Sequence, residues 1–371
     1  MQEVNIPMLT QQVLWGAFAV SFVFGIIAQR THFCTMGAVS DVVNMGDWTR
    51  MRQWGMAIGV AMIGFASMAQ LGWIDPSKSM YASSRWLWLS GLVGGALFGV
   101  GMVLASGCGS KTLVRVGSGN LKSLVVFVVM GVAAFATLKG ITAVLRVATV
   151  ERAGLDLSGN ASLPALVANW VGLSPALAAW LLALVLGGGL IAWALAGREF
   201  RHADHLLAGL GIGLCVTAMW WVSGRLGFVA EHPDTLQEAF LGTNTGRMES
   251  MTFTAPMAYT LDWLMFFSDK NKVLTLGVMS VVGVVLGSTV QSLWARTFRW
   301  EGFAGTEDLA NHLVGAVLMG VGGVTALGCT VGQGLSGIST LSLTSFMALT
   351  GIIGGAVMGL RYQMWRLERL A

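Results

Sequence analysis

The chain has 371 residues, of which 55% are hydrophobic and only 11% are charged. A soluble domain carries roughly 25% charged residues, so this composition excludes a water-soluble globular protein. The formal net charge of +4 comes from scattered lysines and arginines and not from a basic cluster, which argues against a nucleic-acid-binding protein.

Apolar runs of about 20 residues recur along the chain, the length that a helix needs to cross a bilayer. The first run lacks the basic segment that precedes a signal peptide, so we expect it to be retained as a helix. The sequence predicts an all-α polytopic membrane protein with a single domain and about nine spans, near residues 10–28, 54–73, 86–106, 122–144, 175–196, 205–222, 273–293, 309–327 and 341–360.

Two shorter segments predict extra helices that do not cross the membrane. The apolar run Tyr259–Phe267 is too short to span and indicates an interfacial or re-entrant piece. Residues 145–172 are expected to hold a second short helix that ends near Trp170.

An odd number of spans places the two termini on opposite sides of the membrane. Most arginines near the span ends fall on the membrane face that also carries the C-terminus. They are Arg50, Arg52, Arg198, Arg201, Arg296, Arg299, Arg361, Arg366 and Arg369. Because positive residues favour the cytoplasmic side, we expect the C-terminus in the cytoplasm and the N-terminus outside.

The stretch Val100–Lys122 concentrates the polar chemistry of the chain. A long apolar run stops there abruptly, and glycines on both sides of a thiol allow the backbone to turn sharply and approach a small ligand. The residue order differs from the GxxxxGK[ST] of a phosphate-binding loop, and a membrane span precedes it in place of a strand. The candidate site residues in this stretch are Gly107, Cys108, Gly109, Ser110 and Lys111.

An internal repeat relates this stretch to a second one. Aligning Cys108 with Cys329 also aligns Leu92-Val93-Gly94 with Leu313-Val314-Gly315, and Gly99-Val100-Gly101 with Gly320-Val321-Gly322. The third and eighth spans are an odd number of spans apart, so the copies run in opposite directions. The sequence therefore predicts two inverted repeats, about 10–144 and 205–360, joined by a linking helix at 175–196. Inverted repeats with broken segments are typical of a substrate path near the bilayer midplane.

Three of the four cysteines lie in glycine-, threonine- or serine-rich breaks, where simple packing explains them poorly. We expect re-entrant loops from opposite faces to bring Cys108 and Cys329 together, with Cys34 nearer the cytoplasmic mouth, so that the three thiols form a row. A thiol is a soft, weak donor that suits a sulfur anion without trapping it. Cys215 lies in mid-span, where packing is the simpler explanation. The candidate supporting residues are Arg30, His32, Gly328, Thr330 and Gln333.

Two other classes of membrane protein would leave different signatures in the sequence. A membrane thiol-redox protein would need paired cysteines, and the chain has no CxxC. A cation channel or metal site would need clustered acidic residues or histidines within the spans, which are nearly free of acidic residues. We therefore expect a transporter and not an enzyme, with no cofactor, no metal and no catalytic residues.

The segments QRTHFCTMGAVSD, GALFGVGMVLASGCGSKTLVRVGSGNLKSL and GCTVGQGLSGIS resemble the YeeE/YedE sulfur-transport family over nearly the whole chain. The resemblance implies an hourglass-shaped protein of the bacterial inner membrane. It implies that Cys34, Cys108 and Cys329 pass thiosulfate along by transient S–H···S hydrogen bonds. It also implies a small cytoplasmic sulfur-carrier protein of the TusA type as a partner. Family members differ in substrate, so another sulfur or selenium compound stays open.

Overall fold

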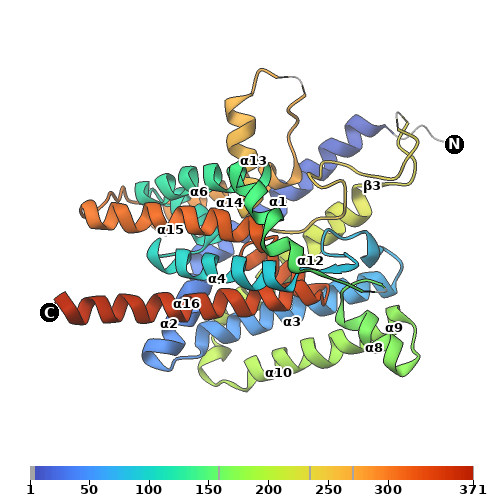
Figure 1. Ribbon diagram of the computed structural model, residues 1–371, viewed down its shortest axis with the longest axis horizontal. Helices are drawn as coiled ribbons and strands as arrows, with labels where there is room; N and C mark the ends of the chain where they lie inside the picture. The colour runs from blue at the N-terminus through green and yellow to red at the C-terminus, as the bar shows by residue number, and fades with distance from the viewer. Residues whose placement is uncertain (1–4, 158, 234, 270, 371) are drawn as a thin grey trace.

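The computed structural model describes residues 5–157, 159–233, 235–269 and 271–370. Long helices dominate it and lie roughly side by side (Figure 1). Seven of them are regular: α1 (Ile6–Thr31), α3 (Thr49–Gln70), α4 (Trp88–Leu104), α6 (Leu121–Lys139), α14 (Leu276–Trp294), α15 (Thr306–Thr325) and α16 (Leu343–Leu370).

Two further long helices contain π-helical turns. The first consists of α9 (Pro175–Leu182), η3 (Ala183–Gly187) and α10 (Gly188–Ala196). The second consists of α11 (Ala203–Leu206), η5 (Leu207–Gly211), α12 (Ile212–Trp221) and η6 (Val222–Leu226).

Short elements fill the connections. The short helices are α2 (Thr35–Met45), α5 (Gly109–Gly117), α7 (Ile141–Ala148), α8 (Leu163–Val171), α13 (Thr254–Met265), η1 (Pro76–Lys78), η2 (Val150–Ala153), η4 (Glu199–Arg201) and the π-helical η7 (Gly332–Gly337). Two antiparallel strand pairs are β1 (Arg85–Trp86) with β2 (Leu155–Asp156) and β3 (Phe228–Val229) with β4 (Ala239–Phe240).

Seven helical stretches among the described residues are long and apolar enough to cross a membrane. They are Ile6–Met45, Trp88–Gly117, Leu121–Lys139, Pro175–Ala196, Ala203–Leu226, Leu276–Trp294 and Leu343–Arg369. The prediction of an all-α polytopic membrane protein is thereby confirmed. The number nine stays a prediction, because α3 and α15 have 22 and 20 residues but are not among these seven.

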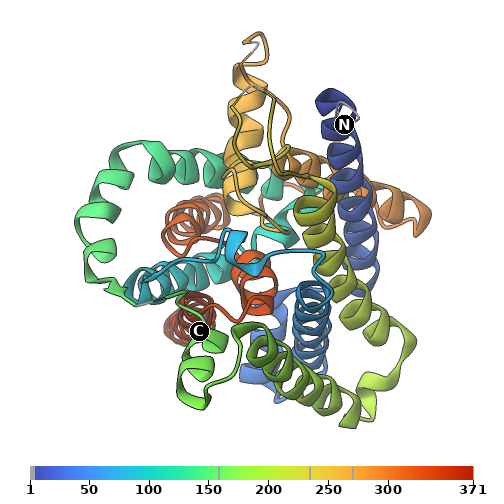
Figure 2. The ribbon, with the colours of Figure 1, turned by 90° about the vertical axis from the view of Figure 1, so that its right-hand side faces the viewer.

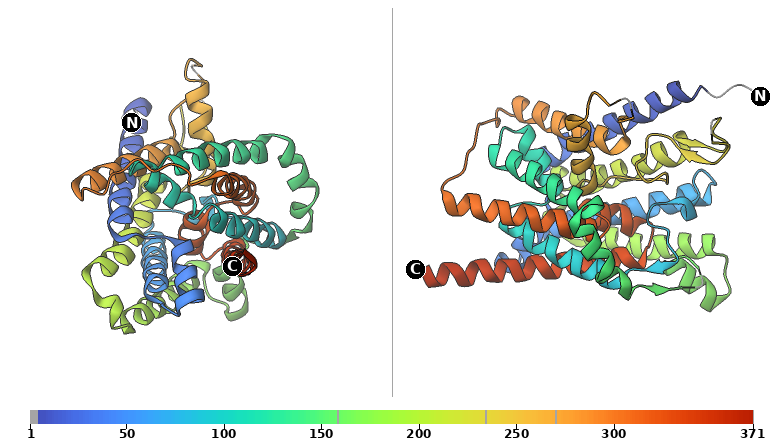
Figure 3. Two further views of the ribbon diagram at one scale, coloured as in Figure 1. Left: turned by 90° about the vertical axis from the view of Figure 1, so that its left-hand side faces the viewer. Right: turned by 45° about the horizontal axis from the view of Figure 1, so that its top comes forward.

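The ends of the described chain lie at opposite ends of the bundle, where α1 begins and α16 ends (Figure 1). Viewed along the long helices, the red-orange segment that follows α15 lies near the centre (Figure 2, and from the other side in Figure 3). Almost every residue from Gly328 to Leu341 is buried, in agreement with this central position.

Helices α4 and α15 cross with their glycines in contact. A Cβ built on Gly101 would lie 2.7 Å from the Gly315 carbonyl oxygen, and one built on Gly322 would lie 2.6 Å from the Gly94 carbonyl oxygen. The sequence alignment equates Gly94 with Gly315 and Gly101 with Gly322. The repeat therefore converts the contact between Gly101 and Gly315 into the contact between Gly322 and Gly94. This exchange is typical of a self-complementary contact between copies related by a two-fold axis. This contact agrees with antiparallel copies at α4 and α15, and the division of the whole chain into two inverted repeats stays a prediction.

The two predicted short helices are present, and the fourth span ends earlier than predicted. The helix predicted within 145–172 is α8, and the run Tyr259–Phe267 forms much of the 12-residue α13. The fourth span was predicted to reach residue 144, whereas α6 ends at Lys139. The extended backbone of Gly140 interrupts it, and α7 begins in a new direction at Ile141.

Candidate functional site

The chain forms the same backbone break before each of the three cysteines. Two residues before the cysteine, a residue other than glycine adopts the left-handed conformation, with φ of 52° at His32, 56° at Ser106 and 60° at Leu327. Such residues are uncommon and are held only where surrounding structure compensates for the strain.

Matching hydrogen bonds close each break. The residue before the cysteine donates its N–H to the carbonyl oxygen five residues earlier, which ends the preceding helix in a Schellman motif. These bonds are Phe33 N to Ala28 O at 3.2 Å, Gly107 N to Met102 O at 2.8 Å and Gly328 N to Gly323 O at 2.7 Å.

Each cysteine then caps the start of a new helix. The N–H four residues later donates to the cysteine carbonyl oxygen, at 3.0 Å for Cys34, 2.9 Å for Cys108 and 2.7 Å for Cys329. The helices that begin there are α2, α5 and the segment 330–339, which contains η7. The partial positive charge of a helix N-terminus therefore lies beside each thiol, which favours a nearby anion.

The three thiols are buried and share one neighbourhood. Cys108 and Cys329 are fully buried, and Cys34 is 6% exposed. The side chains of Cys34 and Cys108 interact directly, and Thr330, next to Cys329, reaches the Cys108 thiol. The repeated break thus brings together residues that lie almost 300 positions apart.

Hydroxyl and backbone groups surround the thiols. Ser110 Oγ lies 3.3 Å from Cys108 Sγ, and Thr35 Oγ1 lies 4.0 Å from it. On the other side, Gly332 N donates to Cys329 Sγ at 3.4 Å. The Thr330 hydroxyl is fully buried and, apart from its approach to the Cys108 thiol, has no hydrogen-bond partner among the described residues, so it can donate to a ligand.

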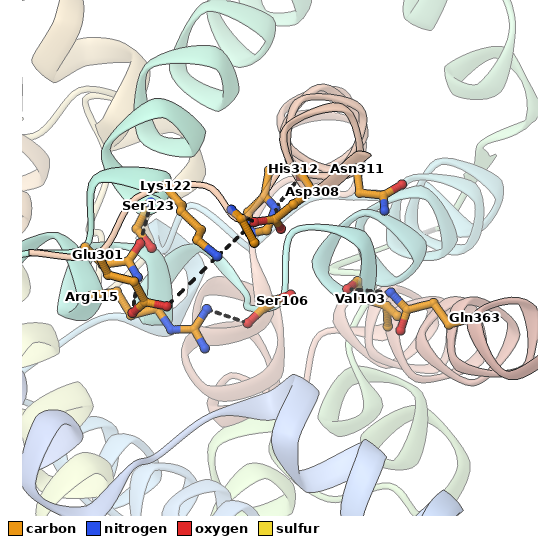
Figure 4. A network of polar contacts seen from close by, with 12 residues as sticks. Val103, Ser106, Arg115, Lys122, Ser123, Glu301, Asp308, Asn311, His312 and Gln363 are labelled. Carbon is orange, nitrogen blue, oxygen red and sulfur yellow. Dashed lines mark hydrogen bonds and ion pairs between the residues drawn. The ribbon is translucent and has the colours of Figure 1, made fainter. Parts of the chain in front are cut away.

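A polar cavity of about 450 Å³ adjoins the break between α4 and α5. It is lined by Gln29, His32, Ser106, Lys111, Arg115, Ser118, Asn120, Lys122, Thr297, Arg299, Glu301, Asp308 and His312. Figure 4 shows how charges are fixed around it: Lys122 Nζ lies 2.8 Å from Asp308 Oδ2, and Arg115 Nη1 donates to the Ser106 carbonyl oxygen at 2.8 Å.

Lys111 links this cavity to the thiols. Its side chain is partly buried, lines the cavity and interacts electrostatically with Cys34 and Cys108. No hydrogen bond or ion pair satisfies it within the described part of the chain. A partly buried cation without a fixed counter-ion is a natural binding partner for an anion.

A second, smaller cavity adjoins the break after α15. It measures about 140 Å³ and borders Leu327 and Gly328, together with Asn244, Thr245, Glu249 and Thr252 from the long connection before α13. Because α4 and α15 run in opposite directions, their breaks face opposite ends of the bundle. One cavity therefore approaches the thiols from each side.

Not every predicted residue joins this site. Arg30 turns away and pairs with Asp204 at 3.0 Å, with both side chains more than half exposed. Gln333 is buried and donates to the Ala326 carbonyl oxygen, which stabilises the end of α15, while its own oxygen has no partner among the described residues. Cys215 lies on α12 within the apolar core.

Three residues near the thiols were not predicted from the sequence. Thr35 approaches Cys108, Tyr81 donates its hydroxyl to the Gly332 carbonyl oxygen at 2.6 Å, and Glu249 lines the smaller cavity. Thr35 had a weak signal in its place beside Cys34. Tyr81 and Glu249 come from connections whose course no local pattern reveals.

A helical bundle with several membrane-spanning helices and a thiol cluster between two cavities defines a membrane transport protein. The chain belongs to the sulphur transport family, whose characteristic sequence matches residues 30–358. The predicted resemblance is thereby confirmed.

Curated relatives agree with this assignment. The thiosulfate transporter TsuA of Spirochaeta thermophila is 27% identical over 347 residues, covering 91% of this chain and 94% of its own. TsuA of Escherichia coli is 28% identical over 334 residues, covering 89% and 87%. The probable transporter YedE of Escherichia coli is 31% identical over 117 residues, covering 32% and 26%.

Proposed function

We propose that this protein takes up thiosulfate, or a closely related small sulfur anion, into the cytoplasm along a path formed by Cys329, Cys108 and Cys34. The observation that carries the proposal is the convergence of three cysteine-capped helix starts between two cavities. Similarity to two thiosulfate transporters over about nine-tenths of the chain supports the choice of anion.

The path has a suitable donor for each part of the anion. The terminal sulfur of thiosulfate accepts weak hydrogen bonds from thiols, while its oxygens accept stronger ones from Thr330, Ser110 and the N–H groups of the short helices. Weak bonds at successive thiols allow the anion to move on, as conduction requires. No bond to the anion is made or broken along this path, so the protein acts as a transporter and not as an enzyme.

The arginine distribution orients the path. With the N-terminus outside and the C-terminus in the cytoplasm of a bacterial inner membrane, the smaller cavity receives the anion and the larger one releases it. Lys111 and Arg115 then lie at the inner end, where their charge draws the anion inward. A TusA-like sulfur-carrier protein would collect the sulfur from the larger cavity.

Uptake by a host that lacks its own thiosulfate transport tests the proposal. Cells carrying this chain should grow on thiosulfate as sole sulfur source and take up radiolabelled thiosulfate. Cys108→Ser keeps the size and a hydroxyl but removes the soft sulfur contact, so it should abolish uptake at an unchanged membrane level. Cys215→Ala is the matched control and should transport normally. No growth on thiosulfate, or wild-type uptake by Cys108→Ser, would contradict the proposal.

A further inference from the structure

The connection before α13 enters the interior of the protein. Met248 N donates to the Lys78 carbonyl oxygen and Met248 O accepts from Met80 N, both at 3.0 Å, which fixes the segment against the chain that follows η1. Two residues further on, Ser250 Oγ donates to Val216 O at 3.0 Å, and Met251 O accepts from Ser336 Oγ at 2.7 Å. The segment is therefore tied to α12 and to η7, beside the cysteine path.

This segment carries a buried acidic residue, Glu249, into the wall of the smaller cavity. Glu249 is only 5% exposed, and its Oε1 accepts a hydrogen bond from Thr245 N at 2.7 Å. It lines the cavity together with Gly328, the residue that precedes Cys329. An anion on its way to Cys329 must therefore pass close to this carboxyl group.

No positive charge neutralises Glu249 among the described residues. Arg146 of α7 lines the same cavity, but its guanidinium pairs with Glu151 at 3.4 Å. The other ionisable groups around Glu249 are Tyr81 and, from α13, Tyr259. Glu249 accepts further hydrogen bonding from Asn244 and Thr245, which are neutral donors.

The surroundings of Glu249 favour its neutral form. It belongs to the connection between the helices that end at Leu226 and begin at Leu276, outside the spanning helices. Burial raises the pKa of this carboxyl group, and the hydrogen bonds from Thr245 and Asn244 lower it only in part. The carboxyl group therefore binds a proton at a higher pH than an exposed glutamate does.

An ionised carboxylate and a dianion repel each other strongly in a site that water screens poorly. We propose that Glu249 is the protonatable gate residue of the smaller cavity, and that the sulfur anion passes it only while the carboxyl group is protonated. The inference rests on the proposed function and orientation. The proton comes from the outer solution and returns to it after the anion has passed, so the gate consumes nothing.

The initial rate of thiosulfate uptake by intact cells, measured against external pH, tests the gate. Above the pKa of Glu249, the protonated fraction decreases by about tenfold for each pH unit. The rate of wild-type uptake should therefore decrease as the medium becomes alkaline, and the decrease should approach that same factor per pH unit. Glu249→Gln keeps an oxygen that accepts from Thr245 N and is permanently neutral. Its uptake should be independent of pH between pH 5.5 and 8, at the rate that wild type reaches in acid.

Glu238→Gln is the matched control. Glu238 lies in the same connection and pairs with Lys78 Nζ at 2.5 Å, but its side chain is 55% exposed and does not line the cavity. This variant should keep the wild-type slope. Loss of the slope in Glu238→Gln as well would overturn the inference, because a general effect of surface charge would then explain it.

The remaining outcomes separate this inference from the proposed function. Absence of uptake by wild type at every pH refutes the function, whereas uptake with the same slope in Glu249→Gln refutes only the gate. If Glu249→Gln does not reach the membrane, Glu249→Asp replaces it. Its shorter carboxyl group meets a different environment, so the midpoint of the pH profile must shift, and an unchanged midpoint overturns the inference.

Discussion

Gly101 and Gly315 pack backbone against backbone, and neither position has room for a side chain. A Cβ on Gly101 would lie 2.7 Å from the carbonyl oxygen of Gly315, and a Cβ on Gly315 would lie 2.6 Å from the carbonyl oxygen of Gly101. Small residues allow this close approach of helices in lipid, where packing supplies most of the attraction. The contact joins α4 to α15, and these two helices end at the breaks that carry Cys108 and Cys329.

Gly101→Val should therefore destabilise the protein. Inserting a branched side chain into a close-packed contact costs about 1–3 kcal/mol, and the strain here falls on backbone atoms that cannot rotate away. The melting temperature of the detergent-solubilised protein should decrease, and the amount recovered as a monodisperse species should fall with it. Gly354→Ala in α16 is the control, because no atom lies within 4 Å of a Cβ at that position. Equal melting temperatures for the two variants would contradict the close contact.

Much of this arrangement could be predicted from the sequence, because its causes are local. Apolar runs of spanning length predicted the helices, and glycine with cysteine at the end of a run predicted the breaks at Cys108 and Cys329. The glycine pairs of the repeat were also visible, since their spacing along α4 and α15 is the same.

Long-range partners could not be predicted in this way. Arg30 was grouped with the thiols because it lies near Cys34 in sequence, yet the fold brings Asp204 to it. Tyr81 and Glu249 lie in irregular connections, which lack the periodic pattern of apolar side chains that predicts a helix or a strand. The end of α6 at Lys139 depended on a single glycine, Gly140, within a run that remained apolar to residue 144.

The different surroundings of Lys111 and Arg30 predict different effects of removing their charges. Lys111 is partly buried near the thiols and has no fixed counter-ion among the described residues. Lys111→Met should therefore lower uptake at low thiosulfate concentration by about tenfold, which corresponds to the loss of one hydrogen bond to a charged group. Arg30→Gln removes an exposed ion pair, which contributes little, so uptake should stay within about twofold of wild type.

Both variants are compared with wild type by measuring the initial uptake rate at increasing thiosulfate concentrations. For Lys111→Met the decrease should be in apparent affinity, and Lys111→Arg should recover part of it because the charge is restored in a different shape. A strong defect in Arg30→Gln together with normal uptake by Lys111→Met would reverse the assignment and place the anion on the other side of α1.

The orientation of the chain is the third prediction. Helix α1 begins at the end of the bundle opposite to the end of α16 (Figure 1), and the arginines of α16, including Arg366 and Arg369, lie beyond its apolar part. The positive-inside rule then predicts that the end of α16 lies in the cytoplasm. A fluorescent protein that folds only in the cytoplasm should be bright when fused after α16, and alkaline phosphatase at the same point should be inactive. An active phosphatase fusion would invert the whole path.

The last prediction follows the accessibility of the two central cysteines. Both Cys329 and Cys108 are fully buried, so a charged thiol reagent can reach them only through a cavity. The smaller cavity borders Gly328, whereas Ser106 borders the larger one. In variants that keep one cysteine each, an impermeant maleimide added outside should label Cys329 faster than Cys108, and should favour Cys108 in inside-out vesicles.

Thiosulfate should slow both reactions, because on the proposed path the bound anion would occupy the space between the thiols. Ser77→Cys, at an exposed position of η1, controls for direct reaction of thiosulfate with the reagent and should be labelled at an unchanged rate. Equal labelling of Cys329 and Cys108 from one side would indicate a continuous open pore in place of two cavities that meet at the thiols. Labelling that thiosulfate does not change would mean that the cysteines pack the interior without touching the anion, since protection requires the ligand and the thiol to share one site.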